Sequence, residues 1–207
     1  MTTLYLSSKQ AKTIASLYEA LDPKALKVGP DFMNGVHVIS TITDDMVQFV
    51  ATDRYTAVVF NAELGEPLPS ASYFKPFTLT ADQCKLLKRA KYDFTIDIGI
   101  DGVRLDTDAG SLFALHIDAT KGNATSTHLG VAVAELVESK MMDRGGLEAA
   151  PQIDLTRVAR LAKVTDAWTM KCLGDLSPIT FSADSLMAIV QPKRHNPNQA
   201  TLPASTP

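Results

Sequence analysis

The chain has 207 residues, of which 45% are hydrophobic and 21% are charged, and its formal net charge is −3. This length allows one large domain or two small ones with a substantial core. The composition is that of a folded soluble protein, and the charge excludes a chain that is basic throughout, although a local basic surface remains compatible with it.

The cysteines and the N-terminal residues bear on the cellular compartment. Cys84 and Cys172 are far apart and match no metal or redox spacing, which indicates buried thiols in a reducing environment. The first residues lack a basic segment followed by an apolar run, and no stretch approaches the length needed to span a bilayer. We therefore expect a cytoplasmic globular protein without a signal peptide and without a membrane association.

The first predicted unit has the order β-α-β-β-β. Its helix places apolar side chains on one side and Lys9 and Lys12 on the other, and Asp22-Pro23 is expected to end it. A polar turn at Thr52-Asp53-Arg54 separates the last two strands. The expected elements are a strand at 4–6, a helix at about 9–21, and strands near residue 36, at 47–52 and at 56–60.

The same order returns after a Gly- and Pro-containing connector at residues 65–70. Thr80 and Gln83 have the spacing of a capping box, which predicts a helix over about 81–91. Lys85, Lys88 and Arg89 group on the side of this helix away from its apolar residues. The expected strands are 77–80, 94–100, 103–107 and 112–117, with hairpin turns between the last three.

Residues 119–150 do not follow this repeated order of elements, and the segment 129–142 fits either a helix or an extended strand. A third unit follows, with its helix capped by Thr156 and basic on one side. Its expected elements are a strand at 152–155, a helix to about 167, and strands at 168–172, 179–182 and 186–190. Residues 195–207 have the composition of a disordered tail.

Three helices with one apolar side and one basic side are the main physical observation. A single helix of this kind is usually a surface helix with solvated lysines, and that interpretation remains open. Three of them on one side of a continuous sheet would instead present a line of charge suited to a phosphate backbone, without an aromatic platform for single strands. The predicted duplex-DNA-facing residues are Lys9, Lys12, Lys85, Lys88, Arg89, Arg157, Arg160 and Lys163.

Several segments resemble the bacterial DNA polymerase III sliding clamp (beta subunit). They are the runs 34–36, 49–53 and 57–58, the connector 64–70 and the closing segment 188–194, and the resemblance covers about 4–118 and 151–194. It implies an α+β DNA-clamp fold of repeated β-α-β-β-β units with helices on one face of a continuous antiparallel sheet. It also implies a complete domain at 1–118 and a second, shortened domain at 119–194.

The resemblance further implies a processivity factor, which is a homo-oligomeric ring around double-stranded DNA, with a trimer favoured over a dimer. The DNA polymerase and the clamp loader would bind a peptide pocket through short motifs, and no cofactor is implied. Arg54, Tyr55 and Thr56 stand where the family has Gly-His-Arg, and Gln191 replaces a methionine, so partner specificity is expected to differ. The implied pocket residues are Thr52, Arg54, Tyr55, Thr56, Ala57, Ile189, Gln191 and Pro192.

Two other function classes remain, a clamp-like regulator and an enzyme. The chain's length and its divergence from the family suggest a phage or mobile-element relative, and the shortened second domain suggests a clamp-like regulator that keeps the fold without closing a ring. An enzyme is disfavoured, because the histidines have no partners at ligand spacing and no nucleophile or phosphate-binding motif is present. No metal site is expected.

Overall fold

The architecture is taken from a computed structural model of the chain, which describes residues 2–29, 33–40, 46–63, 74, 76–98, 103–107, 110–114, 124–142, 153–172 and 178–192. In this part of the chain the strands are β1 (Thr2–Leu6), β2 (Gly35–Ser40), β3 (Met46–Thr52), β4 (Thr56–Glu63), β5 (Phe77–Thr80), β6 (Phe94–Ile98), β7 (Val103–Thr107), β8 (Gly110–Ala114), β9 (Thr169–Lys171), β10 (Ile179–Ala183) and β11 (Leu186–Val190). The helices are α1 (Ser8–Glu19), α2 (Pro23–Val28), α3 (Ala81–Leu87), α4 (Ala124–Met142) and α5 (Leu155–Leu161).

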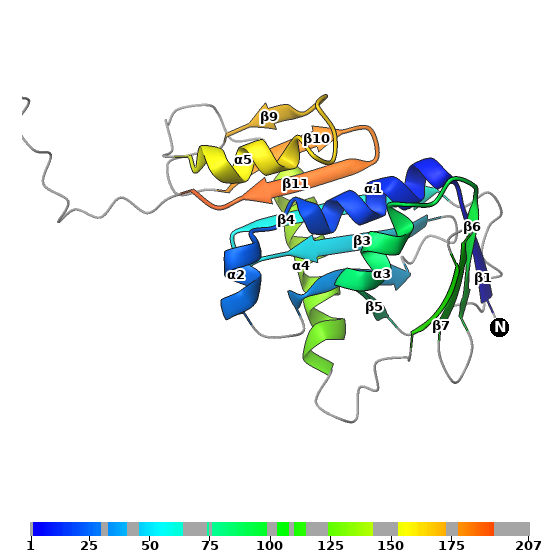
Figure 1. Cartoon of the computed structure of the whole chain (residues 1–207). Helices are drawn as coiled ribbons and strands as arrows, with labels where there is room; N and C mark the ends of the chain where they lie inside the picture. Colours follow the sequence, from blue (N-terminus) through cyan, green and yellow to red (C-terminus); the bar gives the residue numbers. More distant parts are fainter. Residues whose placement is uncertain are drawn as a thin grey trace, which may run out of the picture.

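All described strand pairings are antiparallel, and they form two sheets (Figure 1). One has the order β1-β6-β7-β8 and the other the order β5-β2-β3-β4-β11-β10-β9. We call β1 to β4 with α1 and α2 unit 1, β5 to β8 with α3 unit 2, and α5 with β9 to β11 unit 3. The predicted repeats are therefore present, distributed over two sheets.

Units 1 and 2 interlock by exchanging their first strands. The β1 strand of unit 1 pairs with β6 at the edge of the unit 2 strands, and β5 of unit 2 pairs with β2 of unit 1. Helix α3 also packs on β2 and β5, and α1 packs beside α3. Each unit thus completes the other, which accounts for a joint core rather than two separate ones.

The helix starts follow from local capping. Ser7 and Gln10 form a reciprocal capping box at α1, and Thr80 and Gln83 form the predicted one at α3. Helix α1 ends at Glu19, slightly before the predicted end at about residue 21, and Asp22 caps the short helix α2, which was not predicted. Proline is favoured in the first helical turn because its missing N–H is not needed there, so Asp22-Pro23 starts α2 shortly after α1 has ended.

Helices α1, α3 and α5 lie on one face of the sheets, where the main core is formed (Figure 1). Leu17 of α1, Leu87 of α3 and Leu161 of α5 are fully buried in this core. Unit 3 is joined to unit 1 by pairing of β11 with β4, in the register Ala188 opposite Val58. The core is consequently continuous across the three units.

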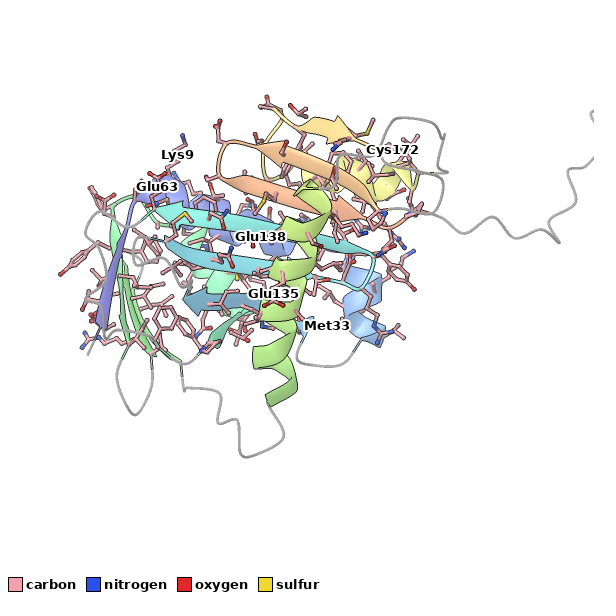
Figure 2. The ribbon with its side chains drawn as sticks, turned by 180° about the vertical axis from the view of Figure 1, so that it is seen from behind. Lys9, Met33, Glu63, Glu135, Glu138 and Cys172 are labelled. Carbon is pink, nitrogen blue, oxygen red and sulfur yellow. The ribbon has the colours of Figure 1, made fainter. Side chains whose placement is uncertain are left out.

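Helix α4 lies on the opposite face of the seven-stranded sheet, where it crosses β2, β3, β4 and β11 (Figure 2). Its Ala134 and Val137 are buried in a second apolar cluster that includes Val50 and Val59. The Gln48 side chain donates a hydrogen bond of 2.6 Å to Oε1 of Glu138. The segment left open between helix and strand is therefore a helix, and it covers the sheet face that the other helices leave bare.

Unit 3 differs from its prediction at its start. Ile153 and Asp154 are not in a strand, and Asp154, rather than Thr156, caps α5 by accepting a hydrogen bond from the Thr156 N–H. Helix α5 also ends at Leu161, well before residue 167. The predicted tail at 195–207 lies outside the described residues. None of the described helices is long and apolar enough to cross a membrane.

Candidate functional site

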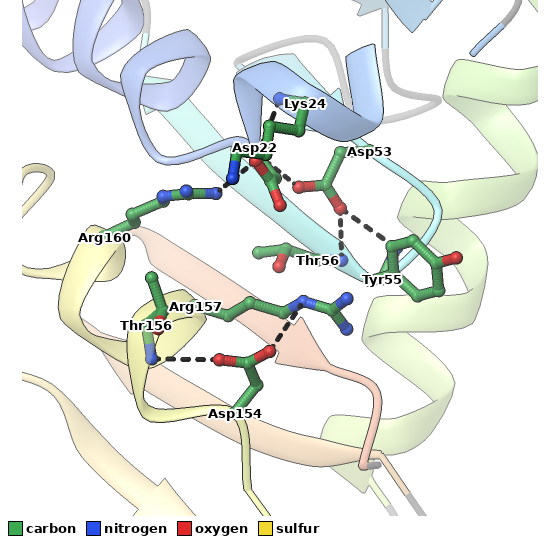
Figure 3. Close-up of polar contacts among 9 residues, drawn as sticks. All are labelled: Asp22, Lys24, Asp53, Tyr55, Thr56, Asp154, Thr156, Arg157 and Arg160. Carbon is green, nitrogen blue, oxygen red and sulfur yellow. Dashed lines mark hydrogen bonds and ion pairs between the residues drawn. The ribbon is translucent and has the colours of Figure 1, made fainter. Parts of the chain in front are cut away.

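The turn between β3 and β4 is built around the carboxylate of Asp53, which is 1% exposed. Its Oδ1 accepts hydrogen bonds from the backbone N–H groups of Tyr55 (3.0 Å) and Thr56 (2.7 Å). Its Oδ2 accepts one from the N–H of Asp22 at 2.6 Å, so the turn is also tied to the start of α2 (Figure 3). Because a buried carboxylate with three N–H donors is well compensated, the turn is a fixed platform.

Arg54 lies at the tip of this turn with a φ of 78°, in the left-handed region. This conformation is disfavoured for a residue with a Cβ, and it explains why a glycine is the usual residue at this position in the family that the sequence resembles. Arg54 and Tyr55 are both exposed, whereas Thr52 and Thr56 are buried. Of the turn residues predicted for the pocket, Arg54 and Tyr55 are therefore the accessible ones.

Pairing of β4 with β11 brings the two predicted halves of the pocket together. Thr56 lies opposite Val190 and Ala57 opposite Ile189, and the N–H of Gln191 donates a 2.7 Å hydrogen bond to the carbonyl of Tyr55. Gln191 and Pro192 are half-buried at the end of this seam. The β3–β4 turn and the end of β11 thus form one contiguous surface.

The guanidinium groups of α5 close one side of this surface. The Arg157 guanidinium carbon lies 4.0 Å from the centre of the Tyr55 ring, a cation–π contact, and its Nε is 3.8 Å from an Asp154 oxygen (Figure 3). Arg160 forms a 3.0 Å ion pair with Asp22. The backbone N–H of Lys24 and then Arg160 hold the pKa of Asp22 below its ordinary value. Arg157 and Arg160, predicted to face DNA, are instead engaged at the seam between units 1 and 3.

Helix α4 covers the other side of the predicted pocket. Ala57 and Ile189 point to the sheet face on which α4 lies and are only 5% and 3% exposed. Half-buried Val133 packs against the same cluster. The eight predicted pocket residues are therefore close together, but their accessible part is limited to Arg54, Tyr55, Gln191 and Pro192.

The remaining predicted DNA-facing residues are exposed on the helix face of the molecule. Lys9 and Lys12 lie on α1, Lys85 lies on α3, and Lys88 and Arg89 follow at its C-terminal end. Two of these five cations are paired, Lys85 with Asp82 at 2.8 Å and Lys88 with Glu19 at 2.6 Å. Exposed ion pairs are weak, and a phosphate can compete for such lysines. Lys163 is exposed just beyond α5.

Three residues in or near this site, Asp22, Lys24 and Lys27, were not predicted from the sequence. Asp22 anchors both the β3–β4 turn and Arg160, and Lys24 and Lys27 of α2 add exposed cations on a helix that was not predicted. The Asp-Pro pair at 22–23 was the available signal, because Asp before Pro is a helix start as well as a helix stop.

Burial shifts the pKa of two titratable side chains in the described core, Cys84 and His37. Among the described residues, no group of three His, Cys, Asp or Glu side chains is arranged to hold a metal ion. Burial raises the pKa of the Cys84 thiol to about 12 and lowers the pKa of His37 to about 4, so both are neutral at physiological pH. His37 Nδ1 is 2.9 Å from Thr78 Oγ1 in the β2–β5 pair.

Comparison with known proteins identifies the fold. No protein-family model and no curated protein sequence matches the chain. Among solved structures, the chain is similar to the DNA polymerase III beta subunit of Thermotoga maritima, with a TM-score of 0.63 and 13% identity over 94% of this chain and 65% of that one. For the beta chain of Streptococcus pneumoniae the TM-score is 0.66, with 13% identity over 94% and 65%. For the DNA polymerase sliding clamp of Bacillus subtilis it is 0.64, with 11% identity over 93% and 64%.

These likenesses confirm the fold that the sequence resemblance predicted. The chain has the architecture of bacterial DNA polymerase III beta sliding clamps, and it spans slightly less than two thirds of the length of these three structures. At 10–13% identity the likeness extends to the path of the backbone and leaves the binding residues to be judged from this chain alone.

Proposed function

We propose that this protein is a sliding-clamp-like processivity factor, in which copies of the chain form a ring around duplex DNA. The observation that supports it best is the interlocked pair of β-α-β-β-β units, with exposed Lys9, Lys12, Lys85, Lys88 and Arg89 on the helix face. In a ring with that face inward, these cations would contact phosphates without reading bases. Retention would come from topology, so tight contacts are not required.

The accessible seam residues give the proposal a partner site. A short segment of a DNA polymerase or clamp loader would dock against Tyr55 and Arg54 on one side and Gln191 and Pro192 on the other. The Arg157 contact holds the Tyr55 ring in place, which reduces the entropy lost on binding. The proposal includes a domain at residues 1–118 and a shortened one at residues 119–194. It also includes a ring of three copies and a location in the cytoplasm.

Retention on circular DNA tests the proposal. The protein is loaded on nicked circular DNA by its cognate loader, or by letting free chains assemble around the circle. It is expected to stay bound at moderate salt and to dissociate once the circle is linearised. Lys12→Glu with Lys85→Glu is expected to reduce loading by about tenfold or more, because each lost phosphate contact weakens binding and lowers the salt dependence. Equal retention on linear and circular DNA would contradict the ring.

A matched control lies on the opposite face. Lys140 is on α4, on the sheet face away from α1 and α3, so Lys140→Glu makes the same charge change outside the proposed DNA surface. It is expected to leave loading unchanged. A similar loss in both variants would indicate a general charge effect rather than a surface that faces DNA.

The second candidate is a clamp-like interaction protein that does not close on DNA. Helix α4 favours it, because it covers Ala57 and Ile189 in the predicted partner groove. This candidate predicts that a partner binds as a stable complex in the absence of DNA and that binding survives Lys12→Glu with Lys85→Glu. The clamp proposal predicts that the same variant loses polymerase stimulation together with DNA loading.

A further inference from the structure

The arginine that braces the Tyr55 ring has donors that its neighbours leave unused. A guanidinium carries five N–H donors and stays charged at physiological pH. In the described part of the chain, the buried Nε of Arg157 has no hydrogen-bond partner, and the Asp154 oxygen that faces it is 3.8 Å away, which is too far for a hydrogen bond. Arg157 is thus held in place by a long ion pair and by the Tyr55 ring, with donors to spare for an incoming acceptor (Figure 3).

Arg54 adds a second guanidinium at the tip of the same turn. It is exposed, and no carboxylate among the described residues lies within ion-pair distance of it. Its φ of 78° is strained for a residue with a Cβ and unstrained for glycine. The turn therefore carries a charged side chain at a position where the backbone alone favours none.

The carboxylates around this turn already have partners. Asp53 accepts three backbone N–H groups, Asp22 forms a 3.0 Å ion pair with an arginine of α5, and Asp154 caps α5. Two further cations, Lys24 and Lys27, are exposed on α2, which Asp53 ties to the turn. Over the described residues of the turn, α2 and α5, the charge left for a partner is positive.

Accessible apolar surface lies next to these cations. The Tyr55 ring is 44% exposed, although the Arg157 guanidinium carbon lies 4.0 Å from its centre. Pro192 is half-buried, and the hydrogen bond from the Gln191 N–H to the Tyr55 carbonyl fixes the end of β11 beside the turn. A segment that fits both properties has an apolar side chain next to a negative charge.

We infer that the partner segment is acidic and that one of its carboxylates binds Arg54 and Arg157 beside Tyr55. A neighbouring apolar side chain of the segment lies on Tyr55 and Pro192. Arginine and carboxylate form charge-assisted, often bidentate hydrogen bonds, which gives selectivity as well as affinity. A DNA phosphate meets the same charge requirement but leaves Pro192 without a contact, which favours a peptide. The inference rests on the proposed partner site and adds a chemical selectivity to it.

Titration with short synthetic peptides, followed through the amide resonances of the protein, tests the inference without DNA. The probes are Gly-Gly-Asp-Phe-Gly-Gly and the same peptide with Asn or with Lys in place of Asp. At low ionic strength the Asp probe is expected to bind about tenfold more tightly than the Asn probe and to shift the Arg54 and Tyr55 resonances. Added salt should reduce this preference, because it screens exposed charges.

Substitutions of the two arginines separate binding from folding. Arg54→Gly removes the guanidinium and relieves the strained φ, so the preference for Asp should fall while the thermal midpoint stays the same or rises. Arg54→Glu should reverse the preference, so that the Lys probe binds more tightly than the Asp probe. Arg157→Lys keeps the charge without the planar fork and should weaken the preference. Arg104→Gln is the control, since Arg104 is an exposed arginine on β7 in the other sheet, and it should leave the preference unchanged.

Three results would overturn the inference. They are equal affinity for the Asp and Asn probes, an unchanged preference in Arg54→Gly, and no shift of Arg54 or Tyr55 with any probe. Tighter binding of a single-stranded oligonucleotide at the same resonances would overturn it as well, because phosphate would then be the ligand. None of these results bears on the ring, which is tested by retention on circular DNA. Conversely, loss of that retention with an intact preference for Asp would reject the ring and keep the acidic partner.

Discussion

Removal of the Asp53 carboxylate is expected to destabilise the protein more than any substitution at the surface of the β3–β4 turn. In Asp53→Ala the N–H groups of Asp22, Tyr55 and Thr56 lose their common acceptor in a place that is 1% exposed. A hydrogen bond to a charged group contributes about 1.5–3 kcal/mol, and partial relaxation allows some of these donors to reach water. We expect a loss of about 3–5 kcal/mol, a large part of the usual stability of a domain.

Urea unfolding followed by circular dichroism measures this loss. For a slope of about 1–3 kcal/mol per molar urea, the midpoint of Asp53→Ala should fall by more than about 1 M. Asp53→Asn retains an oxygen for Tyr55 and Thr56 but faces the Asp22 N–H with an amide, so it should lie between Asp53→Ala and the unsubstituted protein. Asp166→Ala is the control, since Asp166 is exposed in the loop after α5, and its effect should stay within about 0.5 kcal/mol.

The same substitution has a local signature. The amides of Tyr55 and Thr56 should exchange faster in Asp53→Ala even under conditions where the protein remains folded, because their acceptor is gone. If Asp53→Ala unfolds within about 1 kcal/mol of the unsubstituted protein, the carboxylate does not hold the turn, and the fixed position assigned to Tyr55 is wrong.

Two further predictions concern the pH dependence of stability and the attachment of α4. Burial lowers the pKa of His37 from 6.5 to about 4, so the unfolded chain binds a proton in this window that the folded chain does not. The free energy of unfolding should therefore fall by about 2 kcal/mol between pH 7 and pH 5 because of His37. In His37→Gln the dependence of stability on pH should be flatter over this range. A dependence equal to that of the unsubstituted protein would contradict the burial of a neutral imidazole. Val137 is 0% exposed between α4 and the sheet, so Val137→Ala should lower the free energy of unfolding by about 2 kcal/mol. Leu136 is 42% exposed on the same helix, and Leu136→Ala should lower it by less than about 0.5 kcal/mol. Equal effects of the two substitutions in urea unfolding would mean that α4 does not pack as described.

The fold was predictable because its signals are local and repeated. The capping box at Thr80 and Gln83 and the alternation in β6 depend on residues close in sequence, and they were correctly read. Helix α4 was left open for a physical reason: Val131 and Leu136 are exposed while Ala134 and Val137 are buried, so apolar residues occur around the helix and mark no single side.

The two halves of the candidate site were predicted unequally well. The resemblance correctly joined the β3–β4 turn with the last strand, but the partners of Arg157 and Arg160 depend on tertiary structure. A helical wheel places Arg157 about 40° from the buried Leu161 and Arg160 about 100° from it, so both side chains start beside the unit's own core rather than opposite it. The pairing of β11 with β4 then sets α5 beside Asp22 and Tyr55, so that this side faces another unit rather than solvent.

Helix α4 covers part of the groove in which the clamp resemblance places a partner peptide. A groove that accepts a peptide must leave apolar side chains accessible, yet Ala57 and Ile189 are already covered by the chain's own helix. A partner segment therefore either displaces α4 or binds only the exposed end of the seam. Because displacement would uncover Val50 and Val59 as well, we expect binding at the end of the seam, where the Tyr55 ring, braced by Arg157, is the principal apolar contact. Tyr55→Ala should then abolish partner binding. Val137→Ala, which weakens the packing of α4, should leave partner binding unchanged. Tighter partner binding in Val137→Ala would show that α4 competes with the partner for the groove.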